Sequence, residues 1–235
     1  MKFFLKTFDL KQYKNGVILL GPSELDKTKV TRYEPQPKLA NIYKEAEEWA
    51  NIMDIDKVTT LNKIIEKKQI GEIIRTVEAL HDKKLSQIAD IIKENKKRVI
   101  LIAAPSSSGK TSFANRLCIH LKVNGLNPVP ISLDDYFLNR EDTPLDEFGK
   151  YDFESIHAID LEKFNSDLRD LLEGNEINLP KFNFKTGKRE NSYKKLKIKD
   201  NQPIILEGIH GLNPILTESI PDKDKFKIYI SALTQ

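Results

Sequence analysis

The hydrophobic residues of the second half of the chain fall alternately into short continuous runs and amphipathic stretches. Four runs rich in β-branched residues predict buried strands at 98–104, 129–133, 203–207 and 226–231. After the first run, Phe113, Leu117 and Leu121 recur every four residues and predict a helix. A second amphipathic stretch at 161–173, preceded by Asp160 as an N-cap, predicts another helix. This alternation predicts an α/β fold with a parallel sheet covered by helices on both faces.

The first part of the chain has a different pattern. Alternating residues at 2–20, with a turn at Asn15-Gly16, predict a β-hairpin, and a Pro-containing link follows. Periodic apolar positions then predict helices at about 39–53, 61–67 and 72–94. We therefore divide the chain into a hairpin segment, a helical linker region and an α/β domain, at residues 1–36, 37–97 and 98–235.

Between the first predicted strand and its helix lies a loop typical of phosphate binding. Residues 104–111 read APSSSGKT, the Walker A pattern with Ala104 in place of the first glycine. Backbone N–H groups of such a loop point at an anion, and the dipole of the following helix adds partial positive charge. Lys110 would place its charge between the outer phosphates, and Thr111 would offer a hydroxyl to Mg²⁺. We expect the nucleotide to contact Ser106, Ser107, Ser108, Gly109, Lys110, Thr111 and Ser112.

Acidic residues follow two further predicted strands. Asp134 comes after the second strand and Glu207 ends the third, and ligands of an open parallel sheet gather at such carboxyl ends. We expect Glu207 to help hold Mg²⁺ and Asp134 to accept the proton of an attacking hydroxyl. Acids at strand ends are also simple caps or turn formers, and we assign that role to Asp135. His210 is an alternative base, but Asp134 is preferred because it follows a different strand, where an acceptor can approach the γ-phosphate in line.

Composition narrows the class of protein. The net charge of +3 over 235 residues does not by itself indicate a nucleic-acid partner. The single cysteine, Cys118, excludes internal disulfides and lies on an apolar helix face, as a packing residue would. No stretch approaches the roughly 18 apolar residues of a membrane span, and the N-terminus does not have the form of a signal peptide. We expect a cytoplasmic protein without a membrane partner.

A lysine-rich segment at 180–200 predicts an exposed hairpin or flap. Its charge would also suit RNA, whose binding would depend steeply on salt. Runs of charge are usually solvated surfaces, and this segment has few aromatic residues among its lysines. RNA binding is therefore the weaker alternative.

Five blocks together resemble the phosphoribulokinase/uridine kinase family of P-loop kinases. They read APSSSGKTSFANRL, ISLDDYFLNRE, KYDFESIHAIDLEKF, LPKFNFKTGKR and ILEGIHGLNP, and the resemblance covers about residues 99–235. Within the family, the chain looks most like long bacterial uridine kinase-like proteins whose kinase follows a segment related to threonyl-tRNA synthetase. The resemblance implies ATP- and Mg²⁺-dependent phosphoryl transfer to a hydroxyl of a nucleoside or a similar small alcohol.

The resemblance also implies roles for individual residues. Asp134 falls on the family's catalytic base, Glu207 on its Walker B-like carboxylate and Asp152 on the acid that holds the ribose hydroxyls. The residues that fall around the nucleoside are Phe137, Phe182 and Arg189.

Two departures from the family pattern change these expectations. Gly187 stands where pyrimidine nucleoside kinases have a base-reading histidine, so the acceptor is expected to be another nucleoside or a different alcohol. The sequence ends at Gln235, before the family's arginine-bearing lid, which predicts weak transfer by a fragment of a longer kinase. The sheet edge left unpaired would favour a homo-oligomer. The alternatives are a catalytically silent ATP-binding regulatory module and a kinase of a non-nucleoside alcohol.

Overall fold

The computed structural model describes residues 8–13, 16–24, 26–190, 194–218 and 220–231. Its internal contacts divide the chain into two compact units, residues 1–75 and 76–235. Each unit is described by itself.

The second unit is built on a parallel sheet of four strands in the order β10-β3-β9-β4. The strands are β3 (Val99–Ala103), β4 (Val129–Ser132), β9 (Ile204–Glu207) and β10 (Lys225–Tyr229). All four predicted strands are present, each within two residues of the expected ends. Parallel strands need crossover connections, and helices provide two of them. The α/β class predicted from the sequence is confirmed.

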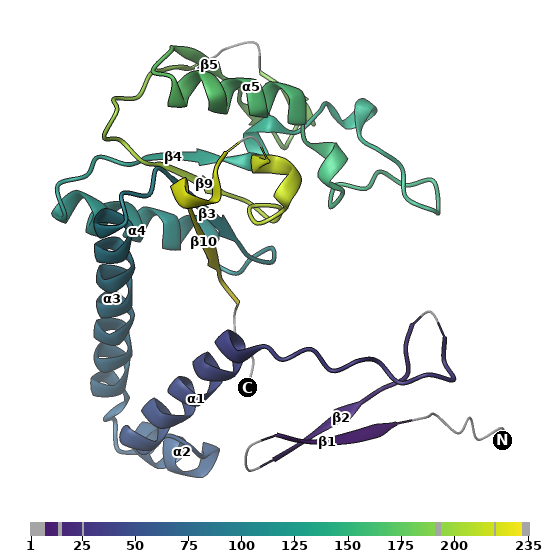
Figure 1. Ribbon diagram of the computed structural model, residues 1–235. Helices are drawn as coiled ribbons and strands as arrows, with labels where there is room; N and C mark the ends of the chain where they lie inside the picture. Colours follow the sequence, from purple (N-terminus) through teal and green to yellow (C-terminus); the bar gives the residue numbers. More distant parts are fainter. Residues whose placement is uncertain (1–7, 14–15, 25, 191–193, 219, 232–235) are drawn as a thin grey trace. The chain divides into compact units, whose positions relative to one another are not determined.

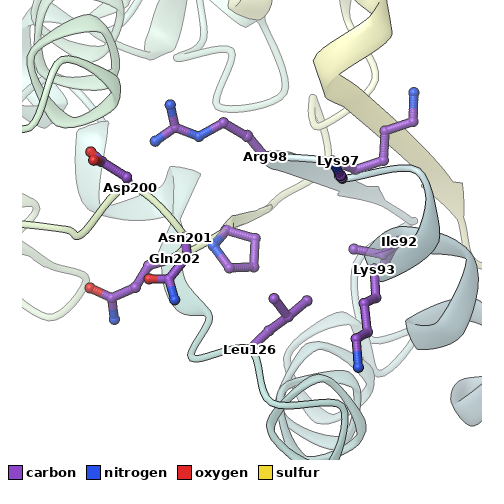
Figure 2. Close-up of a pocket in the computed structure, with 10 residues that line it drawn as sticks. Ile92, Lys93, Lys97, Arg98, Leu126, Asp200, Asn201 and Gln202 are labelled. Carbon is purple, nitrogen blue, oxygen red and sulfur yellow. The ribbon is translucent and has the colours of Figure 1, made fainter.

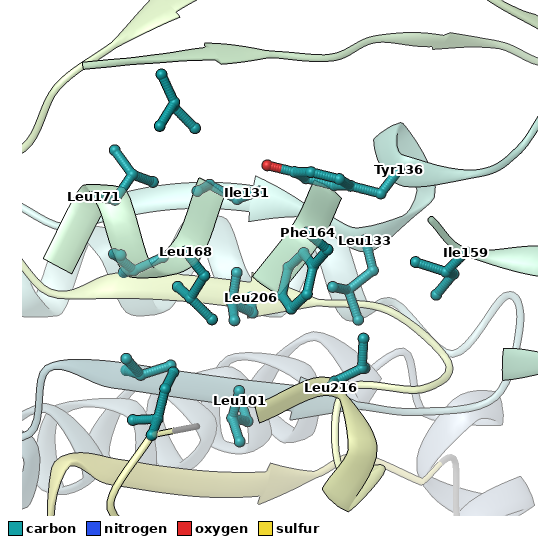
Figure 3. Close-up of a cluster of buried hydrophobic side chains, with 14 of the residues drawn as sticks. Leu101, Ile131, Leu133, Tyr136, Ile159, Phe164, Leu168, Leu171, Leu206 and Leu216 are labelled. Carbon is teal, nitrogen blue, oxygen red and sulfur yellow. The ribbon is translucent and has the colours of Figure 1, made fainter. Parts of the chain in front are cut away.

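Both faces of this sheet are covered. The helix α4 (Lys110–Val123) lies on one side of the sheet and α5 (Leu161–Leu172) on the other (Figure 1). In β3, Ile100 and Ile102 belong to the core cluster on the α4 side, whereas Leu101 belongs to the cluster beside α5. Successive side chains of a strand point to opposite faces, so a strand that is apolar throughout must be buried on both. Figure 3 shows the second cluster, in which Leu101 and Leu206 face the α5 side chains.

The second half of the long helix α3 (Ile70–Glu94) belongs to this unit. Its residues Leu85, Ala89 and Ile92 are fully buried, in the same cluster as Ile100. The contact division therefore falls inside α3, and the linker boundary at residue 97 stays a prediction. The periodicity of the helix predicts an apolar face but not the surface that this face covers. The assignment of 1–36 and 37–97 as separate segments stays a prediction.

Short elements connect the large ones. The 3₁₀ turns are η1 (Leu133–Tyr136), η2 (Arg140–Asp142), η3 (Ile156–Ala158), η4 (Pro214–Thr217) and η5 (Asp222–Asp224). Two small antiparallel ladders pair β5 (Ile177–Leu179) with β8 (Lys194–Leu196), and β6 (Phe182–Asn183) with β7 (Lys188–Arg189). The predicted flap at 180–200 is therefore only partly exposed, since Phe182, Gly187 and Ile198 are buried.

The first unit has a hairpin followed by helices. The strands β1 (Asp9–Tyr13) and β2 (Gly16–Leu20) pair antiparallel, as predicted, while the predicted residues 2–7 and the turn residue Asn15 lie outside the described residues. The helices α1 (Pro37–Ile52) and α2 (Val58–Glu66) contain no buried residue. Among the helices of the described residues, none has the length and apolar character that crossing a membrane requires.

Candidate functional site

Three chain segments meet at the carboxyl edge of the sheet because of its strand order. Glu207, the last residue of β9, lies opposite Ile102 of β3 on one side and Ser132 of β4 on the other. The loop after β3 and the turn η1 after β4 therefore leave the sheet on either side of Glu207. The three segments that the sequence singled out thus leave the sheet at one edge.

The loop after β3 has the backbone that an anion site requires. Gly109 is the N-cap of α4 in a left-handed conformation (φ 83°), and no side chain caps the helix there. Ser107 also has a positive φ of 59°, so the loop bends sharply twice. Uncapped N–H groups of a first helical turn are satisfied by water or by a ligand, and their partial positive charge suits a phosphate.

The loop closes on one of its own carbonyl groups. The Lys110 ammonium donates to the Pro105 carbonyl at 3.0 Å, and the Ser108 hydroxyl donates to the same oxygen at 2.6 Å. A phosphate oxygen would be a stronger acceptor for Lys110 than this neutral carbonyl. Lys110 is thus held at the loop, and rotation of its side chain would bring the ammonium group to a bound anion.

A hydroxyl and a carboxylate meet beside the loop. The Thr111 hydroxyl donates to Oε1 of Glu207 at 3.2 Å, and the Glu207 side chain is buried with 7% of its surface exposed. Mg²⁺ prefers oxygen ligands and is usually held by one or two protein groups together with phosphate oxygens and water. The two side chains therefore fit a magnesium ion brought in with a nucleotide.

The charges of Glu207 and Lys110 both act on the carboxyl group of Asp134. Burial raises the pKa of Asp134 above its ordinary value, the negative charge of Glu207 raises it further, and Lys110 lowers it. Charges perturb one another in this way only at short range. Asp134 follows β4 and Glu207 ends the neighbouring β9, so the two acids leave the sheet from adjacent strands.

We expect Asp134→Asn to raise the melting temperature of the protein by a few degrees at pH 7.5. A carboxyl whose pKa is raised on folding destabilises the folded state when it is ionised, and asparagine removes that charge. The gain should be full above the raised pKa and should vanish as the pH falls toward 3.8, the ordinary value, because the wild-type carboxyl is then protonated. Thermal melts of both proteins between pH 4 and 8 measure the difference, and a lower melting temperature of the variant throughout would contradict the prediction.

Three aromatic rings gather at the end of η1. Phe137, which follows η1, packs against Phe182 at 5.7 Å and against Phe184 at 6.4 Å between ring centroids. The N–H of Phe182 donates to Oδ1 of Asp135 at 3.4 Å, which fixes the β6–β7 hairpin to η1. Phe137 and Phe182 are thus brought together, and their place around a nucleoside stays a prediction. Phe184 was missed, although the spacing of phenylalanines in PKFNF places both rings on one side of a strand.

Arg189 faces inward. Its Nε and Nη2 donate to the carbonyl groups of Phe137 (2.9 Å) and Tyr136 (3.0 Å), and Nη1 pairs with Asp160 at 2.9 Å. All three guanidinium nitrogens are therefore used to attach the hairpin to η1 and to the start of α5. In this conformation Arg189 anchors the hairpin, and its contact with the acceptor stays a prediction.

We expect Arg189→Met to lower the free energy of unfolding by about 2–4 kcal/mol, since it removes several charge-assisted hydrogen bonds and leaves Asp160 without its partner. The neighbouring Lys188→Met is the matched control. Lys188 pairs with Glu141 at 3.5 Å and keeps 60% of its side chain exposed, so its loss should cost less than about 1 kcal/mol. Urea unfolding of the two variants tests the anchor, and equal midpoints would contradict it.

The structure gives less support to the roles considered for Asp152 and His210. The hydrogen bonds that Asp152 makes in the described part of the chain stay in its own loop, to Pro144, Glu154 and Ser155. Its role toward a sugar is therefore unsupported by a contact and stays a prediction. His210 follows Glu207 closely, but its Nε2 is enclosed and has no hydrogen-bond partner, so it is poorly placed to receive a proton from an incoming hydroxyl.

A separate cavity of about 280 Å³ lies at the opposite edge of the sheet. It is lined by Arg98 and Pro203, which precede β3 and β9, and by Ile92 and Leu126 (Figure 2). None of the predicted site residues borders it. The side chains that the sequence singled out therefore lie away from this cavity.

Comparison with known proteins agrees with this arrangement. The model of the Phosphoribulokinase / Uridine kinase family matches residues 99–235. A uridine kinase of Ligilactobacillus salivarius is 29% identical over 138 residues, which are 59% of this chain and 62% of that protein. A uridine kinase of Ureaplasma parvum is 30% identical over 132 residues, which are 56% of this chain and 61% of that protein.

Among solved structures, that of a possible uridine kinase from Bacillus stearothermophilus is 23% identical, with a TM-score of 0.49, and the match covers 62% of this chain and 80% of that one. The chain spans about three-fifths of the length of the curated relatives named above. The family model begins at residue 99, so the likeness of residues 1–36 to a synthetase segment stays a prediction. Because that model covers more than half of the chain, the chain belongs to the phosphoribulokinase/uridine kinase family.

Proposed function

We propose that this protein binds ATP and Mg²⁺ and transfers the γ-phosphoryl group to a hydroxyl of a nucleoside or a similar small alcohol. The observation that carries the proposal is the hydrogen bond of Thr111 to Glu207 beside an uncapped helix N-terminus, with Asp134 following the strand next to that of Glu207. Uridine kinases among the relatives support the reaction class.

Each residue has a distinct part in this reaction. The N–H groups of Gly109 to Ser112 and the Lys110 ammonium would bind the phosphates, and Thr111 and Glu207 would hold Mg²⁺. When bound, the ion neutralises charge on the phosphoryl oxygens. Asp134 would orient the acceptor hydroxyl and take its proton as the new bond forms. Its raised pKa makes it a better proton acceptor than an ordinary aspartate.

The test uses the full chain and separates binding from turnover. Calorimetry with a non-hydrolysable ATP analogue and Mg²⁺ should detect binding, and ADP release should rise above the hydrolysis background with at least one member of a panel of nucleosides and other small alcohols. Binding of the analogue without turnover on any acceptor would identify a nucleotide-binding module instead of a kinase. If the analogue does not bind, both the kinase and the nucleotide-binding module are excluded.

Self-association is a further part of the proposal. The strand β10 pairs only with β3 in the described sheet, so its outer edge can pair with another chain. Sedimentation velocity over a range of concentrations measures the oligomeric state.

A further inference from the structure

Helix α5 carries an acidic residue on the face that it packs into the core. Its buried residues are Phe164, Asp167, Leu168 and Leu171, the spacing of one helix face. Only 7% of the surface of Asp167 is exposed. A carboxylate at such a position costs stability unless hydrogen bonds and charges satisfy it, so its partners indicate what it does.

Two side chains satisfy Asp167. The Tyr136 hydroxyl donates to Oδ2 at 3.1 Å, and the Lys163 ammonium lies 3.1 Å from Oδ1 and 3.0 Å from Oδ2. Lys163 lies one turn earlier on the same helix, whereas Tyr136 is the last residue of η1 and is fully buried. The hydrogen bond to Tyr136 therefore joins α5 to the turn that carries Asp134.

Tyr136 is held at both of its ends. Its ring packs edge-on against Phe164, with the ring centroids 5.1 Å apart, inside the cluster of Figure 3. Its backbone carbonyl accepts from the Asp160 N–H at 2.9 Å and from Nη2 of Arg189 at 3.0 Å. With its hydroxyl bonded to Asp167 as well, Tyr136 fixes the end of η1 against α5.

The backbone of Asp134 has weaker attachments of its own. The Asp134 N–H donates to the Ser132 hydroxyl at 3.4 Å, and the Asp134 carbonyl accepts from the Phe137 N–H at 3.4 Å. Both are longer than the usual distance of about 2.9 Å and correspondingly weak. Because Tyr136 lies two residues after Asp134 in the same short turn, the position of Asp134 depends on where Tyr136 is held.

We propose that Asp167 is a positioning residue for phosphoryl transfer, acting through the Tyr136 hydroxyl to hold η1, and with it Asp134, in place. The inference rests on the proposed function, because it concerns the base of the same transfer. Displacement of a reacting group by about 1 Å can lower a rate about 10²-fold. Loss of the Tyr136–Asp167 hydrogen bond should therefore slow transfer without changing the loop that binds the nucleotide.

The first pair of variants separates the hydrogen bond from the ion pair. Tyr136→Phe removes the hydroxyl and keeps the Lys163–Asp167 pair. It should lower kcat at least about tenfold and change the affinity for the ATP analogue less than about twofold. Lys163→Met removes the ion pair and keeps the hydrogen bond, so it should lower the melting temperature and leave kcat within about threefold of wild type. Tyr43→Phe, at an exposed position of α1, is the matched control and should change neither quantity.

The second pair of variants tests Asp167 directly. Asn at position 167 keeps an oxygen acceptor for the Tyr136 hydroxyl but loses the charge that pairs with Lys163, whereas Ala loses both. Asp167→Asn should therefore keep kcat within about threefold of wild type, and Asp167→Ala should lower it at least about tenfold. A structural role without positioning would instead make kcat follow the melting temperature through all four variants.

Amide hydrogen exchange of residues 132–137 gives a readout besides turnover. This segment should exchange faster in Tyr136→Phe and Asp167→Ala than in the wild-type protein, and at the wild-type rate in Lys163→Met. Wild-type kcat or wild-type exchange of this segment in Tyr136→Phe would overturn the inference, as would an equal loss of kcat in Lys163→Met. These results leave wild-type turnover and the proposed function intact. If the wild-type chain transfers no phosphoryl group to any acceptor, the proposed function fails, and this inference with it.

Discussion

Replacing Asp134 by asparagine should lower phosphoryl transfer by about 10²–10⁴-fold and leave the affinity for the ATP analogue nearly unchanged. Asparagine keeps the shape and polarity of the side chain but cannot accept the hydroxyl proton, and general-base catalysis typically contributes a factor of this size. Steady-state turnover with the best acceptor, together with calorimetry of the analogue, measures the two quantities in one preparation.

The matched control is Asp142→Asn. Asp142 is an exposed carboxylate in η2 that accepts a hydrogen bond from the Asn139 amide at 3.3 Å. The Asp142→Asn variant removes the same charge at the protein surface, so it should change turnover less than about threefold. Wild-type turnover in Asp134→Asn would remove Asp134 from the role of base, and an equal loss in the control would indicate a general electrostatic effect.

Replacing Lys110 by alanine should weaken binding of the ATP analogue by about 10- to 150-fold. A charge-assisted hydrogen bond contributes about 1.5–3 kcal/mol, and each 1.4 kcal/mol is a factor of ten in affinity. In the described structure the Lys110 ammonium is bonded only to the neutral Pro105 carbonyl, so the variant should fold normally and its defect should appear in binding.

Lys122→Ala is the control for this variant. Lys122 lies on the same helix, in its last turn, and is exposed. Its loss should leave analogue affinity within about twofold of wild type. Equal affinities of Lys110→Ala and wild type would show that the loop does not bind phosphate through this lysine.

Much of the sheet could be predicted from local sequence. A continuous run such as VILIA is apolar on both sides of a strand, so it can lie only between two covering layers. The order of a small-residue loop, Gly109 and an amphipathic helix likewise predicts a helix N-terminus facing the end of that strand. Asp134 and Glu207 could be identified because parallel strands end at a common edge, whatever their order in the sheet.

Other features depend on partners that are distant in the sequence. The periodicity of α3 does not show that Leu85, Ala89 and Ile92 pack beside Ile100. The composition of the lysine-rich segment predicts exposure, but Phe182 is buried because the ring packs on Phe137. Packing against a partner decides burial, and a single segment does not contain its partner.

The sequence by itself determined the class of this protein: a parallel sheet whose carboxyl edge bears a Walker A loop and two acids, in the phosphoribulokinase/uridine kinase family. Only the tertiary structure decided how Arg189 is used. Its guanidinium is bonded within the protein, to the carbonyl groups of Phe137 and Tyr136 and to Asp160. The physical reason is that a side chain's charge is fixed by its residue type, but the groups that satisfy that charge are fixed by the fold.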